Sequence, residues 1–480
     1  MENQGLIKER LKIISSVDEN ITAFSLYDGS RTTTITYRQF LNDIFKATGF
    51  FVRKDIKNHH IAIAAPTSYD WIVAFFAIVG SGNIAVLLNP DLPKEVLQQQ
   101  CEQADVTIVC SNTPCMMEFC TNCGGVEYFS FEEIKAGMPI SMKEIYSCAP
   151  DDTITMLFTS GTMGESKIAE ISSKNFETHM SDVEIVYKSN KAQKFLLCLP
   201  LFHIFALDCT IGCLQRKKTV CIGRGMRYVF SDLPVFNPDF VALVPAVLES
   251  MVKILDGAKT AEERQKCIGS NLSGIVLGGA GVKPDLCRYM INLGIKMNSL
   301  YGMTESTGSG LFCIWDEDNL GTIGRPYGET ECRIVDGELL MRTPAIMNGY
   351  YKNPGETAKI LEDGWLHTGD LAHCDENGYY YLIGRKKNVI ILSNGENVNP
   401  EEIEAQLGEC PEILECMVYG DKKGICADVY MNNESAVADF IKKYNEAVPL
   451  YRQIYKVNYS FTPLEKTGTG KIKRKENAYV

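Results

Sequence analysis

The chain has 480 residues, enough for about three domains and a large buried core. Of its residues 45% are hydrophobic and 22% charged, which is typical of a globular protein, and no window approaches the ~18 apolar residues of a transmembrane helix. The formal net charge of −12 argues against a nucleic acid as the main partner, because a phosphate backbone repels an acidic surface.

The first twenty residues, MENQGLIKERLKIISSVDEN, predict an amphipathic helix, since they lack the apolar core and cleavage site of a secretion signal. The 18 cysteines are therefore expected to be reduced thiols in a cytoplasm. Four of them lie close together, and the last three have the C-x4-C-x2-C spacing of some iron–sulfur sites: Cys110, Cys115, Cys120 and Cys123. A surface loop is the favoured interpretation, because no further ligand is visible at a telling distance.

Short β-branched runs alternate with amphipathic stretches over most of the chain. Eight runs predict buried strands that end at Gly, Pro, Ser or Asn: 60–66, 83–90, 106–112, 154–160, 194–200, 219–225, 240–245 and 273–281. Helical patterns lie between some of them, at 71–82, 94–104 and 246–258. This alternation predicts an α/β fold with parallel sheets covered on both faces. In such sheets ligands bind at the carboxyl ends of strands.

The segment FTSGTMGESK, residues 158–167, follows one of these strands and combines glycines, hydroxyls and one lysine. Glycines let a backbone approach a ligand, and hydroxyls and a lysine supply donors and positive charge, which suits a polyphosphate. The spacing of Gly161, Gly164 and Lys167 differs from the Walker pattern GxxxxGK[ST]. An ordinary turn is the alternative.

Two later segments also carry polar groups. NSLYGMTES, residues 298–306, could stack a base, contact a phosphate and hold Mg²⁺, or it could be a turn. Asp370 in an HTGD loop faces Arg385 one predicted hairpin later. Such a pair is most often a structural ion pair, and it would also suit the two hydroxyls of a ribose.

The sequence pattern changes in the last ~95 residues. They predict a helix, two strands, a second helix and a basic end: 400–407, 415–420, 425–432, 436–447 and 452–475. A basic end is usually a solvated tail. This one contains TGTGK, a glycine-rich loop that ends at Lys471, so a functional loop competes with that interpretation.

Eight segments, taken in chain order, resemble the core motifs of the adenylate-forming superfamily: FTSGTMGESK, LPLFHIF, LGGAGV, LYGMTES, GELLMRTPAIMNGYY, DGWLHTGD, GRKKNVIILSNGENVNPEEIE and KTGTGKIKR. The superfamily includes acyl-CoA synthetases, adenylation domains of peptide synthetases and firefly luciferase. The chain looks closest to fatty-acyl-CoA and 4-coumarate-CoA ligases. Each motif alone is weak, but eight in the same order and spacing make a coincidence very improbable.

The resemblance implies an α/β fold with a large N-terminal domain, residues 1–384, of parallel sheets flanked by helices plus a β-barrel-like subdomain. A hinge at 385–388, centred on Lys387, would join it to a small mobile α+β domain, residues 389–480. It also implies two chemical steps. A carboxylate attacks the α-phosphorus of ATP with Mg²⁺ to give an acyl-adenylate and pyrophosphate, and a thiol, that of CoA or of a carrier protein's phosphopantetheine, then displaces AMP.

Site residues follow from the resemblance position by position. The phosphate loop would contain Thr159, Ser160, Gly161, Thr162 and Lys167. The adenine would lie between Gly278, Gly279, Ala280 and Tyr301. Thr304 would contact the α-phosphate, Glu305 would bind Mg²⁺, and Asp370 and Arg385 would bind the ribose. Lys471 would bridge the substrate carboxylate and the phosphate, and Gly395 would face the pantetheine arm.

Some positions depart from the superfamily's pattern. Met163 stands where a second threonine is usual in the phosphate loop, Ser166 replaces a proline and Ile168 a glycine. Asn388 stands where an acidic residue is common. The charged residues all remain, which favours an active enzyme. Because the second threonine is missing from the phosphate loop, a slower or degenerate enzyme stays an open alternative.

His203 in LPLFHIFAL is the strongest indication of which class of carboxylic acid the enzyme activates. A lone histidine among apolar residues is more often a core residue, but by the resemblance it forms a wall of the acid pocket. The substrate-binding aspartate of peptide-synthetase domains is missing, Asp208 is interpreted as structural, and Phe205 replaces a tyrosine of the coumarate enzymes. An unsubstituted fatty or aromatic acid is therefore favoured.

Three hypotheses stay open: an acyl-CoA ligase, a ligase that loads a carrier protein, and a non-catalytic protein that binds AMP or an acyl-adenylate. A cytoplasmic monomer or homodimer without a membrane span is expected. Arg224 in the CIGRG turn could contact CoA phosphates, but ordinary solvent exposure is favoured.

Overall fold

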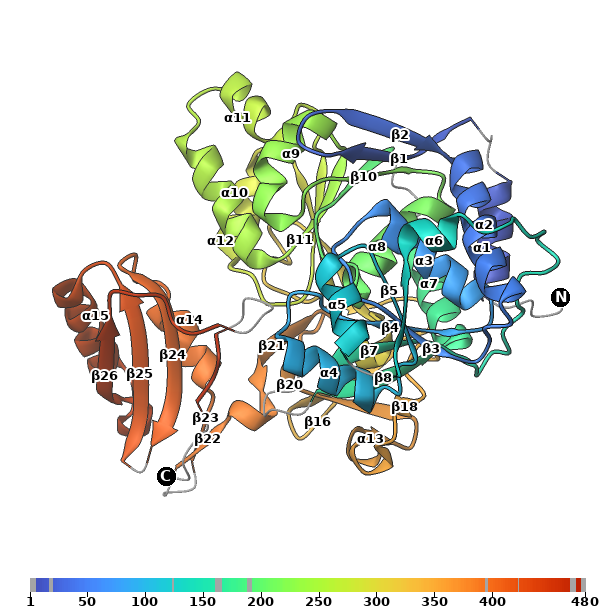
Figure 1. The fold of residues 1–480 in the computed structure, drawn as a ribbon. Helices are drawn as coiled ribbons and strands as arrows, with labels where there is room; N and C mark the ends of the chain where they lie inside the picture. Colours follow the sequence, from blue (N-terminus) through green and yellow to red (C-terminus); the bar gives the residue numbers. More distant parts are fainter. Residues whose placement is uncertain are drawn as a thin grey trace. The chain divides into compact units, whose positions relative to one another are not determined.

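The computed structural model describes residues 6–16, 20–122, 125–159, 166–187, 192–392, 396–421, 423–466 and 472–475. The chain forms two compact units (Figure 1): Met1–Glu331 with Met341–Leu366, and Cys332–Leu340 with His367–Val480. The predicted hinge at residues 385–388 stays a prediction.

A nine-stranded sheet runs through the first unit in the order β15-β14-β13-β12-β11-β9-β10-β1-β2. Its neighbouring strands from β1 to β13 are parallel, and antiparallel pairs extend it at both edges. Its strands are β1 (Thr22–Tyr27), β2 (Thr32–Thr36), β9 (Lys194–Leu197), β10 (Thr219–Ile222), β11 (Phe240–Leu243), β12 (Gly274–Leu277), β13 (Lys296–Gly302), β14 (Gly310–Trp315) and β15 (Arg325–Pro326).

The first unit contains a second, seven-stranded sheet in the order β18-β8-β7-β4-β3-β5-β6. β3 to β7 are parallel where they pair, whereas β8 returns antiparallel to β7. Its strands are β3 (His60–Ile63), β4 (Ile84–Leu87), β5 (Ile108–Ser111), β6 (Glu127–Ser130), β7 (Thr153–Thr159), β8 (Lys167–Ser172) and β18 (Gly349–Tyr350).

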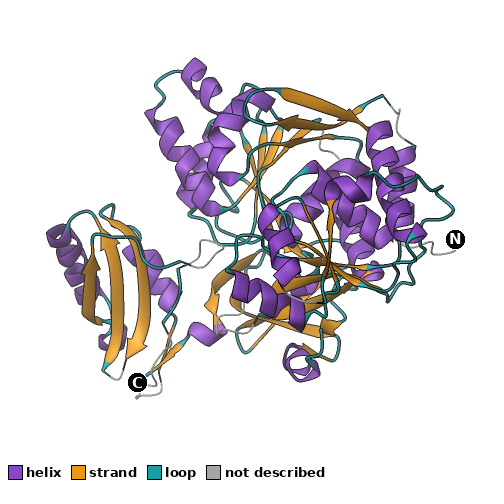
Figure 2. Cartoon of the chain, in the orientation of Figure 1, coloured by secondary structure: helices purple, strands orange, loops and turns teal. Residues whose placement is uncertain are grey.

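Helices of this unit cover the strands (Figure 2): α1 (Leu6–Ser15), α2 (Tyr37–Arg53), α3 (Tyr69–Gly80), α4 (Lys94–Gln103), α5 (Pro114–Asn122), α6 (Phe131–Lys135), α7 (Ser173–Tyr187), α8 (Ile204–Gln215), α9 (Val229–Phe236), α10 (Pro245–Gly257), α11 (Ala261–Ile268), α12 (Pro284–Asn292) and α13 (Pro354–Ile360). Side-chain hydrogen bonds determine where some of these helices begin. Thr36 and Gln39 form a capping box at the N-terminus of α2, as Thr260 and Glu263 do at that of α11. α3 is apolar on all sides, and all of it except Asp70 is buried, so it lies inside the unit's core.

A five-stranded sheet has the order β16-β17-β20-β19, with β21 paired to β20. The expected barrel-like subdomain stays a prediction. Its strands are β16 (Glu331–Val335), β17 (Glu338–Arg342), β19 (Leu361–Glu362), β20 (Trp365–Cys374) and β21 (Tyr380–Arg385).

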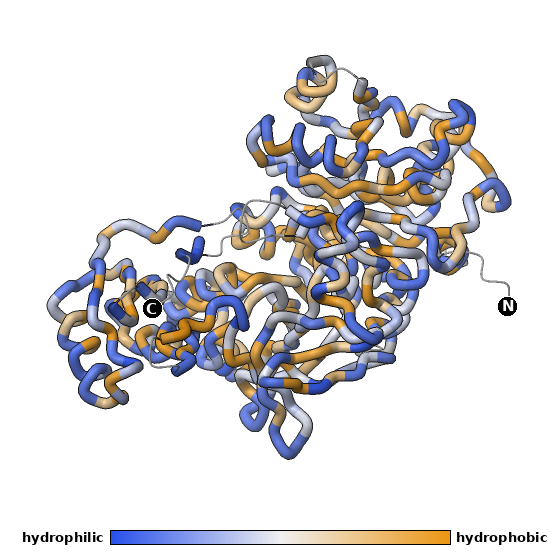
Figure 3. The backbone as a smooth tube through the Cα atoms, turned by 90° about the horizontal axis from the view of Figure 1, so that it is seen from below, coloured by the Kyte–Doolittle hydropathy of each residue, from blue (hydrophilic) through white to orange (hydrophobic). Residues whose placement is uncertain are grey.

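The C-terminal part has its own sheet and core. β24 (Ile413–Asp421), β25 (Gly424–Met431) and β26 (Ile454–Ser460) form the sheet, and β22 (Ile390–Ile391) pairs with β23 (Asn397–Val398). α14 (Pro400–Leu407) and α15 (Glu434–Ala447) contribute to a buried cluster that includes Ile403, Leu407, Val429, Val437 and Ile441. Hydrophobic and hydrophilic stretches alternate along this part as elsewhere (Figure 3).

The α/β class is confirmed, as are the eight predicted strands and three predicted helices between them. The sequence did not indicate which strands belong to which of the two sheets, or that antiparallel pairs extend each of them. In the described part of the chain no helix is long and apolar enough to cross a membrane. The described cysteines are free thiols, and no group of three metal-ligating side chains occurs among the described residues. The surface loop favoured for the cysteine cluster is wrong for its described members: Cys110 lies in β5, Cys115 and Cys120 lie in α5, and Cys110 and Cys120 are buried. Cys123 lies outside the described residues.

Candidate active site

The carboxyl ends of neighbouring strands bring several predicted residues to one edge of the nine-stranded sheet. Leu277 of β12 lies opposite Ser299 of β13, so Gly278 and Tyr301 lie at the same edge. β9 runs parallel to β11, which pairs with β12, and the LPLFH segment follows β9 directly. The residues predicted for the adenine and for the acid therefore share this edge, as expected for a parallel sheet.

Phe205 and Gly278 connect these two groups. A Cβ atom at Gly278 would lie 3.1 Å from two carbons of the Phe205 ring, closer than side chains normally approach. Glycine at 278 thus lets the ring pack directly against the end of β12. Gly278 is buried, whereas Gly279 and Ala280 are exposed beside it.

His203 lies at the N-terminus of α8 and is exposed, so it is not a buried core histidine, the more common case in apolar surroundings. Its ring lies 4.5 Å from that of Phe202, centroid to centroid. Thr67 holds the preceding turn: its hydroxyl donates to the Leu199 carbonyl and accepts from the Leu201 N–H, at 3.2 and 3.0 Å.

Glu305 lies in the short 3₁₀ helix η2 (Thr304–Ser306) after β13, and it is 8% exposed. The Tyr350 hydroxyl donates to Glu305 Oε1 at 2.7 Å, and the Met347 N–H donates to the Glu305 carbonyl at 2.9 Å. Burial and the Glu305 charge raise the pKa of Tyr350, which keeps the phenol protonated. A carboxylate oriented in this way fits a magnesium ligand, since Mg²⁺ prefers oxygen donors.

Lys167 begins β8 and contacts the same tyrosine. Its ammonium forms an ion pair with Glu356 and lies 5.0 Å from the centre of the Tyr350 ring. Hydrogen bonds from Lys167 and from Lys359 lower the pKa of Glu356 to about 2. Tyr350 therefore brings together the lysine predicted for the phosphates and the carboxylate predicted for Mg²⁺.

The rest of the phosphate loop is only partly described. Thr159, the last residue of β7, pairs with Lys167, and its hydroxyl lies 3.4 Å from the Lys167 carbonyl oxygen. Ser160, Gly161 and Thr162 lie outside the described residues, as does Met163.

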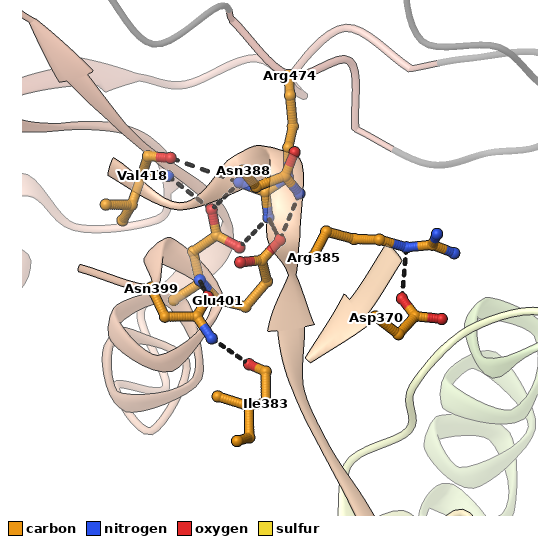
Figure 4. A network of polar contacts seen from close by, with 9 residues as sticks. Asp370, Ile383, Arg385, Asn388, Asn399, Glu401, Val418 and Arg474 are labelled. Atoms are coloured by element: carbon orange, nitrogen blue, oxygen red, sulfur yellow. Dashed lines mark hydrogen bonds and ion pairs between the residues drawn. The ribbon is translucent and has the colours of Figure 1, made fainter. Parts of the chain in front are cut away.

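In the second unit, Asp370 and Arg385 face each other across the β20–β21 hairpin (Figure 4). Arg385 Nε lies 2.6 Å from Asp370 Oδ1, and Arg385 Nη1 donates to the Thr368 carbonyl at 3.2 Å. The predicted ion pair is thus present. Glu338 of β17 supports the HTGD turn by accepting from the Gly369 N–H at 3.0 Å.

Lys387 lies in the 3₁₀ helix η3 (Lys386–Asn388) and is exposed. The side chain of Asn388, which stands in place of an acidic residue, donates to Glu401 of α14 at 2.6 Å (Figure 4). Gly395 and Lys471 lie outside the described residues.

A family model for AMP-binding enzymes matches residues 16–351, and one for the C-terminal domain of AMP-binding enzymes matches residues 387–479. The chain belongs to the AMP-binding enzyme family. A 2-succinylbenzoate–CoA ligase of Bacillus cytotoxicus is 28% identical over 449 residues, 88% of this chain and 84% of the relative. The long-chain-fatty-acid–CoA ligase FadD15 of Mycobacterium tuberculosis is 24% identical over 455 residues, 82% and 76% of the two chains.

Solved structures of other family members have the same fold. O-succinylbenzoate coenzyme A synthetase (MenE) of Bacillus subtilis in complex with AMP has a TM-score of 0.83 at 22% identity, over 97% of each chain. ATP-bound MatB of Rhodopseudomonas palustris has a TM-score of 0.85 at 20% identity, also over 97% of each chain.

Several described residues of the basic end of this AMP-binding enzyme form ion pairs, so this end is not a free solvated tail. Lys466 pairs with Glu415 and Lys475 with Asp428, and Arg474 pairs with Glu404, at 2.5, 2.6 and 2.6 Å in that order. The residues on both sides of the TGTGK loop are therefore tied to the C-terminal sheet and to α14.

Arg224 does not have the ordinary solvent exposure that the sequence favoured for it. Its guanidinium lies 2.6 Å from the buried Asp232 and over the rings of Tyr27 and Tyr228, 5.1 and 4.6 Å from their centres. It is held by a buried carboxylate and two aromatic rings.

Sequence reasoning missed Tyr350, Glu356, Thr67 and Glu338. Tyr350 falls within a segment that resembled a family motif, but no spacing indicates that it contacts both Lys167 and Glu305. Glu356 lies 189 positions from Lys167, and no rule of local sequence pairs residues at such a distance.

Proposed function

We propose that this AMP-binding enzyme is an AMP-forming acid–CoA ligase. A carboxylate attacks the α-phosphorus of ATP, the bond to pyrophosphate breaks, and an acyl-adenylate forms. The CoA thiol then attacks the acyl carbon and AMP leaves with the bonding electron pair. The observation that carries the proposal is the convergence of Lys167 and Glu305 on Tyr350.

The chemistry requires charge stabilisation more than proton transfer, because a carboxylate is already a nucleophile. Negative charge builds on the phosphates, and an ammonium group at Lys167 would counter it. Mg²⁺, when bound at Glu305, would neutralise further charge. Tyr350 keeps both side chains oriented before substrate arrives, which lowers the cost of reorganisation.

The acid is proposed to be a fatty or aromatic carboxylic acid. Phe205 presents an apolar ring against Gly278, and His203 stands exposed at the start of α8. The relatives named above act on 2-succinylbenzoate and on long-chain fatty acids, which are aromatic and aliphatic acids. A cytoplasmic monomer or homodimer remains the expectation.

The test is acid-dependent exchange of labelled pyrophosphate into ATP over fatty acids, cinnamic and benzoic acids, and amino acids. Exchange with a fatty or aromatic acid is expected. Exchange with amino acids alone would contradict the role of His203 and Phe205. No exchange despite bound ATP would favour the degenerate enzyme, and Met163→Thr would then be the first reversion to examine.

The acceptor needs a separate experiment, because CoA and a carrier protein present the same thiol arm. Release of AMP with the preferred acid would be measured with CoA and with a phosphopantetheinylated carrier protein. Turnover with CoA is expected. Turnover with the carrier alone would favour the second hypothesis, a ligase that loads a carrier protein.

A further inference from the structure

The turn that follows Glu305 has an unusual backbone conformation. Thr307 has φ +53° and ψ +26°, and Gly308 has φ +86°. A β-branched residue rarely adopts the left-handed region, and such strain persists only where the surroundings impose it. The strain lies two residues from the predicted magnesium ligand, so what imposes it bears on the position of that ligand.

Part of the support comes from hydrogen bonds within the turn and from one bond to the segment at Ala345. The Thr307 hydroxyl donates to the Ala345 carbonyl and the Ser306 hydroxyl to the Ser309 carbonyl, both at 2.6 Å. The Gly308 N–H donates to the Met303 carbonyl at 2.9 Å.

The remaining support comes from a buried pair on two helices. His179 of α7 is 2% exposed and Asp208 of α8 is 5% exposed. His179 Nε2 lies 2.9 Å from Asp208 Oδ2, and His179 Nδ1 lies 2.8 Å from the Ser309 hydroxyl oxygen. The Gly308 backbone packs on the pair: a Cβ atom there would lie 2.4 Å from Asp208 Oδ2 and 3.3 Å from the imidazole. The pair therefore fills the space behind the turn and leaves room only for glycine.

Asp208 also connects the turn to the start of α8, where the residues predicted to bind the substrate acid lie. It lies one helical turn after Ile204 and three residues after Phe205, on a helix whose first residues follow His203. Other titratable side chains near the pair are Asp182 of α7, Tyr327 and Cys209.

We propose that His179 and Asp208 are positioning residues that hold the strained turn Thr307–Ser309 against α8 and thereby place Glu305 for Mg²⁺. This inference rests on the proposed function. Both side chains are buried behind the turn, so neither is available to the reacting atoms. Their effect reaches the metal through the turn, as partners behind a metal ligand commonly act.

The test compares His179→Gln with the unaltered enzyme by calorimetry with MgATP and with AMP. AMP lacks the two outer phosphates, so its affinity should change less than twofold. The affinity for MgATP should fall, and the Mg²⁺ concentration that gives half-maximal pyrophosphate exchange should rise, by about 10–100-fold. Ser309→Ala removes the hydroxyl that contacts His179 Nδ1 and Tyr327 but leaves the His179–Asp208 pair in place, so it should show the same selective loss at a smaller size. A folding defect in His179→Gln would therefore leave the inference testable.

Tyr69→Phe is the matched control, because it removes a buried hydroxyl that donates to Asp43 at 2.8 Å, between α2 and α3. It should lower Tm without changing either affinity. An equal loss of AMP and MgATP binding in both variants, or no loss of MgATP binding, would overturn the inference while leaving the proposed function intact. If the unaltered enzyme bound neither nucleotide, the proposed function itself would fail.

Discussion

Lys167 shares the Glu356 carboxylate with Lys359, and this arrangement provides a matched pair of variants. Lys167→Met should lower pyrophosphate exchange by about 10²–10³-fold, because one preorganised charge on the phosphates is lost. Lys359→Met removes the other partner of Glu356 and should change the exchange rate less than about threefold. Equal losses in the two variants would mean that Glu356, and not the loop lysine, carries the effect.

Asp182 predicts a pH dependence of stability. Burial raises the pKa of Asp182 to about 6, although the Glu329 N–H and His179 oppose the shift. Between pH ~4 and ~6 the folded protein then binds more protons at this carboxyl than the unfolded chain does, so the contribution of Asp182 to stability falls as pH rises. Above pH ~6 the buried charge opposes folding in full.

Asp182→Asn should therefore raise Tm at pH 8, by a gain of about 1–3 kcal/mol in unfolding free energy, and the gain should shrink towards pH 4. Asp28 is the control of opposite sign, because hydrogen bonds from Arg31 and Ser30 lower the pKa of this exposed carboxyl. Asp28→Asn should not stabilise the protein at pH 8. A gain from Asp182→Asn that is equal at both pH values would exclude this account.

At the scale of elements, the β20–β21 hairpin holds Asp370 opposite Arg385, the pair predicted for the ribose. Asp370→Ala should weaken AMP binding by about 10–100-fold, the loss of a hydrogen bond to a charged group. The loss should disappear with 2′,3′-dideoxy-AMP, which cannot make the bond, and calorimetry measures both.

Lys386→Met is the control for this hairpin, since it removes an exposed ammonium that pairs with the buried Glu338 carboxylate at 2.8 Å, while Glu338 can still accept from the Gly369 N–H. Its AMP affinity should stay within about twofold of the unaltered enzyme. A loss in Asp370→Ala that persists with the dideoxy nucleotide would show that the pair is only structural.

At the scale of the whole molecule, the C-terminal part has its own buried apolar cluster. The residues on both sides of the TGTGK loop form ion pairs with carboxylates of this part, on β24 and α14. A part with its own core can move as one body. We propose on this basis that Lys471, which the resemblance assigns to the first step, is moved away from the site for the second step.

Lys471→Ala should abolish pyrophosphate exchange, yet convert a supplied acyl-adenylate and CoA to the thioester at a rate within about threefold of the unaltered enzyme. Lys473→Ala, which loses only an exposed pair with Glu465, should retain both activities. If both half-reactions were lost in Lys471→Ala, the lysine would not be specific to adenylation.

The strands and helices on which the site is built could be predicted from the sequence, because β-branched runs, turn residues and helical periodicity are local properties. The eight motifs also gave the family and the identity of Lys167, Glu305, Asp370 and Arg385 as candidates. For the strand before the phosphate loop, β7, and the strand before LPLFH, β9, the sequence gives the same signal. Only the tertiary structure places them in different sheets.

The residues that hold the candidates in place were decided by the tertiary structure alone. Tyr350 lies between Lys167 and Glu305, and His179 and Asp208 meet behind the turn at Gly308, although each comes from a different element. Strand partners and buried polar contacts depend on which surfaces the whole chain can bury together. Local patterns do not contain that information, whereas they do determine where each strand ends and which side chain it presents there.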